Sequence, residues 1–329
     1  MTDEFLSPAG LLRGADARRL VTDGKARGLG PALAHLDHLA IGRGTRRRIP
    51  LEAAAPYPDP GRPRVMGIVN ATPDSFSDGG RFLGRAGIEH AERLVAAGAD
   101  ILDIGGESTR PGAAEVSVAE EIDRVCPVIE GARKLGVTIS VDTRKMAVMK
   151  AALGAGAHIV NDVSALGFDP AAAGFLAGQT CPIVLMHARG TPADMQQAPH
   201  YDDLLFEVLV ELSAAIGRAV AAGIARDRLI VDPGIGFAKS VAHNLALVDD
   251  LQVLHALRLP ILLGVSRKSF IGRVAGDIPA EARLPGSLAV AQAGLERGAA
   301  ILRVHDVAET VQAVKLWSAL AIRDEIPLS

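Results

Sequence analysis

RVMGIVNATPDSFSDGG, residues 64–80, places an apolar run directly before a polar segment that ends in two glycines. Such a run is typical of a strand that is buried on both faces. Seven further apolar runs follow, separated by longer alanine-rich segments of helical period. They are ADILDI, VTISV, AHIV, PIVLM, RLIV, PILLGV and AAILRV. Eight strand–helix units predict an α/β fold, the (β/α)8 TIM barrel. An open doubly wound sheet is the alternative, but no GxGxxG follows the first strand.

The composition indicates a soluble globular protein whose main partner is neither nucleic acid nor a membrane. The chain has 329 residues, 49% of them hydrophobic, and a net charge of -3. That charge argues against nucleic acid or an anionic membrane as the main partner. We see no apolar run of membrane-spanning length and no signal peptide, so we expect a cytoplasmic protein. Cys126 and Cys181 are the only cysteines, and we interpret them as reduced, buried thiols.

The first part of the chain differs from the rest. Residues 1–62 are predicted to be an N-terminal extension that is flexible or only locally folded, and residues 63–329 the catalytic barrel domain. The stretch PYPDPGRPR (56–64) is rich in proline and indicates a linker. GRGTRRR (42–48) is interpreted as a solvated segment, and PALAHLDHLA (31–40) as a short helix.

Polar side chains lie at the end of nearly every predicted strand. They are Asn70, Asp142, Asn161, His187, Asp232, Lys268 and Arg303, while the second strand contains Asp103 and leads into GGESTRPGA. In a barrel these ends meet on one face, where active sites are built. Single residues have simpler explanations, since Asp162 and Asp306 can cap helices and His187 can be a core histidine. Capping does not explain a lysine and an arginine among the strand ends.

These residue types suit a flat, polar, phosphorylated ligand. Carboxylate and amide groups can pair with the edge of a heterocycle. The groups in question are Asp142, Asn161 and Asp232. The guanidinium of Arg303 can stack on a ring and hold phosphate. Asn70 and His305 can meet a phosphate or its Mg²⁺. The loops NATPDSFSDGG and GGESTRPGA are long enough to close as lids.

Eight motifs, one for each predicted strand, resemble those of the dihydropteroate synthase family. They are NATPDSFSDGG, LDIGGESTRPGA, SVDTRK, IVNDVSAL, LMHARGTPADMQ, DPGIGFAKS, GVSRKSFIG and RVHDV. The resemblance runs from about residue 64 to about residue 321, in the family's order. It implies a (β/α)8 barrel, a homodimer and membership of an enzyme family that is a sulfonamide target. It also implies a Mg²⁺-dependent transferase of folate biosynthesis. This enzyme joins 4-aminobenzoate to 6-hydroxymethyl-7,8-dihydropterin diphosphate and releases pyrophosphate and 7,8-dihydropteroate.

The resemblance also implies a role for each matching residue. The pterin ring is held by Asp142, Asn161, Asp232 and Lys268, with Arg303 stacked against it and reaching phosphate. The diphosphate side is Asn70, which is the metal ligand, together with His305 and the nearby Thr109. The aminobenzoate side is Arg110, Pro111, Phe237 and Ser269. Met186 and Gly264 complete the substrate-binding set, and Phe76 and Asp78 belong to the first mobile loop. Catalytic roles fall to Asp78, Asp142, Lys268 and Arg303.

The implied chemistry is the departure of diphosphate followed by attack of an aromatic amine. Mg²⁺, Arg303 and His305 neutralise the leaving group. An ionised Asp142 stabilises a carbocation-like transition state on the pterin side. The amine needs orientation more than activation. A helix N-terminus at Ser269 suits the carboxylate of aminobenzoate.

Two other functions fit parts of the pattern. Methyltetrahydrofolate:corrinoid methyltransferases share the acidic and amide pterin contacts but hold no diphosphate. A paralogue that binds pterin without turnover fits every motif, and only kinetics separates it from an enzyme. The sequence departs from the family pattern at Ala71, Met146 and Ala238, and none of these changes removes a group that the chemistry needs. Ala238, which stands where glycine is common, adjoins Phe237.

Overall fold

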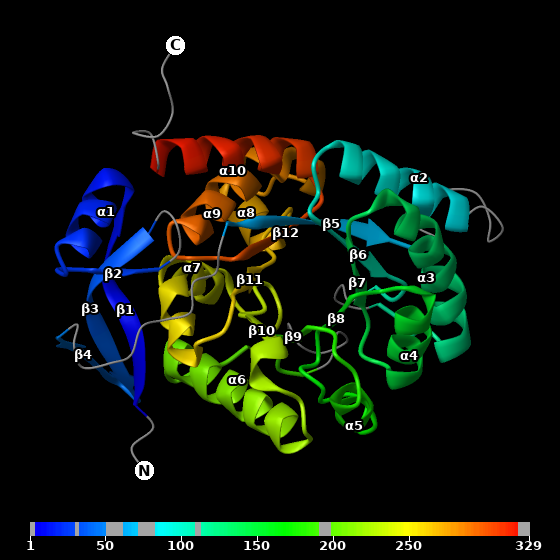
Figure 1. Ribbon diagram of the computed structural model, residues 1–329, viewed down its shortest axis with the longest axis horizontal. Coiled ribbons are helices and arrows are strands. Elements are labelled where there is room, and N and C mark those ends of the chain that lie inside the picture. Colours follow the sequence, from blue (N-terminus) through cyan, green and yellow to red (C-terminus); the bar gives the residue numbers. More distant parts are fainter. Residues whose placement is uncertain are drawn as a thin grey trace.

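The computed structural model contains two β-sheets that lie side by side (Figure 1). It describes residues 4–29, 33–50, 62–71, 83–108, 113–190 and 199–321. Residues 5–49 contribute a four-stranded antiparallel sheet, and the rest of the described chain forms an eight-stranded parallel sheet with helices around it. None of the described helices is long and apolar enough to cross a membrane.

The parallel sheet rolls into the predicted barrel. Its strands are β5 (Arg64–Asn70), β6 (Ile101–Gly105), β7 (Thr138–Asp142), β8 (Ile159–Asp162), β9 (Ile183–Met186), β10 (Leu229–Asp232), β11 (Leu262–Leu263) and β12 (Ile301–Val304). The order is β10-β9-β8-β7-β6-β5-β12-β11. A parallel bridge between Val231 and Ile261 joins the two ends, and the N–H of Val231 donates to the carbonyl of Pro260 at 3.0 Å. The (β/α)8 prediction is therefore confirmed, and the open sheet is excluded.

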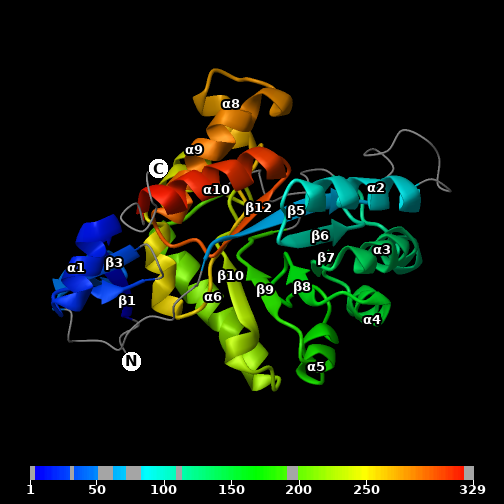
Figure 2. The same cartoon turned by 45° about the horizontal axis from the view of Figure 1, so that its top comes forward.

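Helices cover the outside of the barrel. They are α2 (Leu83–Ala96), α3 (Val118–Ala132), α4 (Met146–Ala155), α5 (Ala172–Ala177), α6 (Leu204–Ala221), α7 (Val241–Asp249), α8 (Ser269–Val274), α9 (Leu284–Leu295) and α10 (Val307–Ala321). Short 3-10 helices are η3 (Arg133–Leu135), η4 (Arg226–Arg228), η5 (Leu251–Leu257) and η6 (Ala280–Arg283). In Figure 2, α8, α9 and α10 lie together on one side of the barrel, and α3, α4 and α5 lie on another. The larger apolar core fills the space between these helices and the strands.

The barrel interior changes from apolar to polar along the strands. Alternate residues of a barrel strand point inward. The inward residues at the amino-terminal ends form an apolar cluster of their own: Met66, Ile101, Ile159, Val184, Ile230, Leu262, Ala300 and Ile301. Two residues further along six strands stand Asp103, Asn161, Met186, Asp232, Gly264 and Arg303. The strand period therefore builds a dry floor beneath a layer rich in polar groups.

The N-terminal extension is more ordered than the sequence indicated. It contains β1 (Phe5–Arg13), α1 (Gly14–Thr22), β2 (Arg27–Gly28), β3 (Leu33–Gly42) and β4 (Thr45–Ile49). The helix expected near residues 31–40 is wrong, because Leu33–Gly42 is a strand that pairs with β1, β2 and β4. Gly44, at φ +64°, makes the tight turn to β4 that a hairpin needs. The linker expected at residues 56–64 lies mostly outside the described residues.

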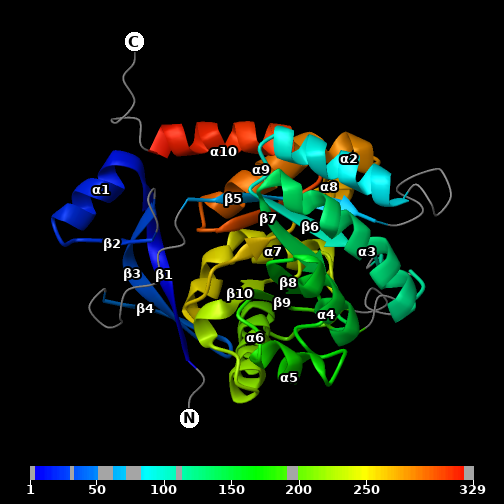
Figure 3. The same cartoon turned by 45° about the vertical axis from the view of Figure 1, so that its right-hand side comes forward.

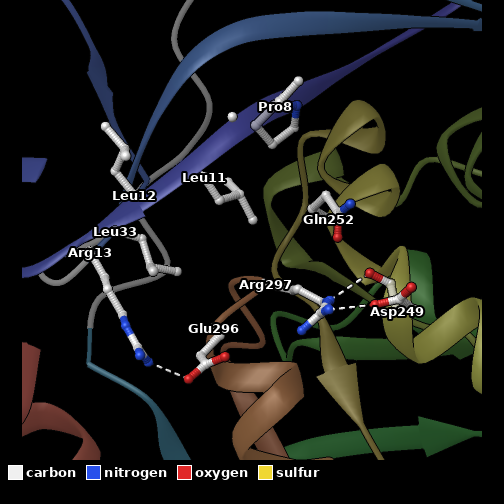
Figure 4. Close-up of a pocket in the computed structure, with 11 residues that line it drawn as sticks. Pro8, Leu11, Leu12, Arg13, Leu33, Asp249, Gln252, Glu296 and Arg297 are labelled. Carbon is white, nitrogen blue, oxygen red and sulfur yellow. Dashed lines mark hydrogen bonds and ion pairs between the residues drawn. The ribbon is translucent and has the colours of Figure 1, made fainter.

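The small sheet packs on the barrel beside η5, away from α2, α3 and α4 (Figures 1 and 3). The Oγ of Ser7 donates to the carbonyl of Gln252 at 3.0 Å. A cavity of about 420 Å³ lies between β1 and the barrel. Figure 4 shows the two ion pairs on its wall, Arg13 with Glu296 and Arg297 with Asp249. We call this boundary the junction.

Candidate active site

Polar side chains from five barrel strands lie at the carboxyl ends of those strands, above the apolar floor. Arg303 on β12 connects two of the carboxylates. Its Nε donates to Oδ2 of Asp103 on β6 at 2.6 Å, and its Nη2 donates to Oδ2 of Asp142 on β7 at 2.7 Å. Asn161 on β8 donates from Nδ2 to the same Asp103 oxygen at 3.1 Å. Arg303 and Asn161 are thus joined through Asp103, which was not among the predicted site residues, and Asp142 is joined to them through Arg303.

Asp142 is poised to change charge near neutral pH. Burial raises its pKa to about 7, although the nearby Arg303 opposes that rise. The neighbouring Asp103 pushes the pKa further upward, because two negative charges disfavour each other in a site with little water. Such a shift is typical of groups that take part in binding or catalysis.

We call the opening of the barrel at the carboxyl ends of its strands the mouth. Asp232 and Lys268 form its other side. Burial raises the pKa of Asp232, and its Oδ1 accepts a hydrogen bond from the N–H of Gly234 at 2.7 Å. Burial lowers the pKa of Lys268 to about 8, and the charge of Asp232 opposes the fall. The Lys268 ammonium lies 4.4 Å from the centre of the Phe237 ring. This side therefore combines a buried acid, a half-buried cation and an aromatic face.

His305 follows β12 directly and is neutral at physiological pH. Burial, with the charges of Arg303 and Arg267, lowers its pKa to about 4. Its backbone N–H donates to Oγ of Ser266 at 3.2 Å, and its Nδ1 lies 3.1 Å from the same oxygen. Ser266 already accepts one hydrogen bond and keeps its proton to donate. This arrangement favours a ring protonated at Nε2, a neutral donor suited to phosphate oxygen.

Smaller predicted residues complete the mouth. Met186 is the register partner of Asp232 across β9 and β10. A Cβ on Gly264 would lie 3.9 Å from Cβ of Arg303 and 4.0 Å from Oδ2 of Asp232, so the glycine keeps the space beside both open. Ser269 is the first residue of α8, next to Lys268.

Asn70 ends β5, on the strand face that carries Met66. Mg²⁺ prefers oxygen ligands and is often held by one or two protein groups together with substrate phosphates. The described part of the chain contains no cluster of three histidine, cysteine or acidic side chains that could hold a metal alone. A single amide oxygen at the strand end fits a Mg²⁺ that shares its coordination with a diphosphate.

Five predicted site residues lie outside the described residues. They are Phe76, Asp78, Thr109, Arg110 and Pro111. The base of the second loop is described and is held by charge. Glu107 accepts from Nε of Arg144 at 2.8 Å and from Nζ of Lys145 at 2.9 Å, and Lys145 also donates to buried Glu121 at 2.7 Å.

Sequence reasoning missed Asp103 as a site residue. This side chain is fully buried, and among the described residues its Oδ1 has no hydrogen-bond partner. The period of two would have found it, since Asp103 follows the floor residue Ile101 by two positions. His187, by contrast, is a core histidine as expected, with Glu211 and Lys239 on its two ring nitrogens.

This fold and site define a class, a (β/α)8 barrel with acidic, amide and basic groups gathered in its mouth. Comparison with protein families matches residues 66–305 to the pterin binding enzymes. The dihydropteroate synthase of Escherichia coli K12 is 49% identical over 263 residues, which cover 79% of this chain and 93% of that protein.

Solved structures agree with the sequence relatives. Xanthomonas albilineans dihydropteroate synthase with 4-aminobenzoic acid matches with a TM-score of 0.75 and 50% identity, covering 81% of this chain and 94% of that one. The Xanthomonas enzyme in complex with 7,8-dihydropteroate matches with a TM-score of 0.72 and 47% identity, covering 81% and 95%. This chain belongs to the pterin-binding enzymes and, within them, to the dihydropteroate synthase family.

Proposed function

We propose that this chain condenses 6-hydroxymethyl-7,8-dihydropterin diphosphate with 4-aminobenzoate, giving 7,8-dihydropteroate and pyrophosphate. The observation that carries the proposal is the buried network of Asp103, Asp142, Asn161 and Arg303, faced by Asp232 and Lys268. A flat ring with amino and amide edges offers complementary donors and acceptors to such groups.

The pterin ring binds between the two sides of the mouth. Asp232 and Asn161 pair with its edge, and the Lys268 ammonium donates to a ring acceptor. Arg303 is held in place by Asp103 and Asp142, so its planar guanidinium is oriented before substrate arrives. A site that is oriented in advance loses less entropy on binding.

The diphosphate departs toward Arg303, His305 and Asn70. Mg²⁺, bound by Asn70 and phosphate oxygens, would supply charge neutralisation at the leaving group. His305 donates from Nε2 to a phosphate oxygen without adding a charge of its own. Arg303 supplies the permanent positive charge on this side.

Asp142 stabilises the positive charge that develops on the pterin side as the diphosphate leaves. Its carboxylate must be ionised for this role, and its pKa of about 7 permits ionisation in neutral solution. No covalent intermediate with the protein is needed, because the aromatic amine is itself a nucleophile.

4-Aminobenzoate is oriented by Phe237 and Ser269. The Phe237 ring offers an apolar face beside the ammonium of Lys268. Ser269 at the start of α8 binds the carboxylate. The family resemblance adds Phe76, Asp78, Thr109, Arg110 and Pro111 from the two loops, and we include them in the proposed site.

The test is pyrophosphate release from the pterin diphosphate with Mg²⁺, with and without 4-aminobenzoate. We expect release that depends on aminobenzoate and yields 7,8-dihydropteroate. Tight pterin binding without turnover would instead indicate a silent paralogue. A lack of pterin binding would overturn the proposed site altogether. Omitting Mg²⁺ and adding a chelator should abolish release if Asn70 holds the ion as proposed.

We further propose a cytoplasmic homodimer. Leu316 and Leu320 on α10 are large apolar side chains with exposed fractions of 59% and 72%, as is Val274 with 59%. Exposed apolar groups that gather on helices often mark contacts between subunits. Light scattering coupled to size exclusion would give the mass, and a monomer at micromolar concentration would contradict this part.

A further inference from the structure

A buried lysine that the proposed mechanism does not use lies behind the mouth, in the loop that follows β10. Lys239 is 3% exposed. Its Nζ lies 2.9 Å from Nδ1 of His187 and donates to the carbonyl of Phe237 at 2.9 Å. Neither the pterin contacts nor the leaving-group contacts use this ammonium. A buried lysine needs a strong reason to be kept, because removing its charge from water is unfavourable.

Lys239 is the last member of a polar network that begins on α6 and consists of Glu211, His187 and Lys239. Nε2 of His187 lies 3.0 Å from Oε2 of Glu211. Burial raises the pKa of Glu211, but hydrogen bonds from His187 and Arg189 outweigh that effect and hold it at about 2. Glu211 is therefore an ionised acceptor, and Nε2 of His187 must carry the proton. Nδ1 can then accept a hydrogen bond from Lys239. Lys239 therefore donates to His187, and His187 donates to Glu211.

The loop after β10, which contains Lys239, is held in an unusual backbone conformation. Gly234, Gly236 and Ala238 all have positive φ, and for Ala238, at +48°, this conformation is unfavourable. The hydroxyl of Tyr201 donates to the carbonyl of Ala238 at 3.2 Å. The carbonyl of Phe237 is thus held by Lys239 and the next carbonyl, that of Ala238, by Tyr201, so the backbone that carries the Phe237 ring is fixed on its carboxyl side.

The geometry points to a positioning role. We propose that Lys239, oriented by His187 and Glu211, fixes Phe237 at the aminobenzoate side of the mouth and so sets affinity for the second substrate. This inference rests on the proposed function. Lys239 acts through Phe237 and does not touch substrate. The charged and titratable groups around its ammonium are Asp232, Glu211, His187, Arg189, His243 and Lys268.

The test compares Lys239→Met with the unmodified chain in the pyrophosphate assay. Methionine keeps the length of the side chain and removes both hydrogen bonds. We expect KM for 4-aminobenzoate to rise about tenfold, because a freed Phe237 no longer presents its ring. KM for the pterin diphosphate should change by less than about twofold. The matched control is Lys150→Met at an exposed position of α4, which should change neither constant.

Two further variants separate positioning from loss of folding. Tyr201→Phe removes the neighbouring hydrogen bond without removing a charge, and it should raise the same KM by a smaller factor. The double variant His187→Phe, Lys239→Met should be no worse for KM than Lys239→Met alone, since the residues act as one unit. Equal changes in both KM values, or additive effects in the double variant, would overturn the proposal. Failure of the unmodified chain to release pyrophosphate would refute the proposed function instead.

Discussion

The barrel mouth and the junction contain the same types of residue under opposite physical conditions. At the junction Arg13 pairs with Glu296, and the two side chains are 58% and 32% exposed. In the mouth Arg303 pairs with Asp103, which is not exposed at all, and with Asp142. Water screens the Arg13–Glu296 pair, so this pair contributes little to stability. The charges of Arg303, Asp103 and Asp142 interact more strongly, because little water lies between them.

This difference shows where the chain places its chemistry. In the mouth the pKa of Asp142 is raised to about 7 and that of Lys268 is lowered to about 8, chiefly by burial. Buried charges that are not fully paired lower the stability of the folded state. Their presence in the mouth therefore indicates binding or catalysis.

The largest effect should come from Lys268→Ala. Removing this cation takes away one of the positive charges that favour the ionised form of the buried Asp232. We expect kcat/KM for the pterin diphosphate to fall about a thousandfold, because the proposed positive donor at the ring edge is lost. Steady-state pyrophosphate release measures it, with exposed Lys134→Ala as the control. Kinetics near those of the unmodified chain would remove Lys268 from the site.

Arg303→Lys should have the next largest effect. An ammonium keeps the charge but cannot donate to Asp103 and Asp142 in the two fixed directions of a guanidinium. We expect kcat/KM to fall about a hundredfold. Pterin binding by titration calorimetry should weaken in parallel. A neutral result would mean that orientation of this cation is unimportant and that charge alone distinguishes the mouth from the junction.

The pH dependence offers a sharper comparison, because Asp142 and Lys268 in the mouth have pKa values near neutrality. Asp142 must be ionised, so kcat/KM should fall about tenfold per pH unit below a pKa of about 7. Lys268 must be charged, so activity should fall again above a pKa of about 8. His305 has a pKa of about 4, and His305→Gln should lower activity without moving the acidic limb. If the acidic limb of the pH profile shifts in this variant, His305 rather than Asp142 is the group that titrates there.

The sequence predicted the barrel well because its information is local. Each strand is a short apolar run, and the period of two places Asn161, Asp232 and Arg303 above the floor. The same period points His187 outward, since it follows inward Met186 by one residue. Asp103 was missed because it lies within a strand, where an acid has no cap or turn to mark it.

The extension was less predictable because its information is not local. The apolar residues Leu33, Leu36 and Leu39 recur every three positions, which suggests a helix. Three strand partners and the turn at Gly44 impose a strand instead. The polar network of Glu211, His187 and Lys239 could not be predicted for a similar reason. Glu211 lies on a helix, and no sequence motif connects it to His187.

The smallest effect should come from the junction itself. Arg13→Ala removes an exposed ion pair with Glu296, and the free energy of unfolding should fall by less than about 1 kcal/mol. Denaturant unfolding measures this change, and Glu296→Ala and the double variant complete the cycle. All three should retain full pyrophosphate release, because the junction holds the small sheet without reaching the mouth. A fall in kcat with intact folding would show that the two regions communicate, and the contrast between a structural and a chemical use of charge would fail.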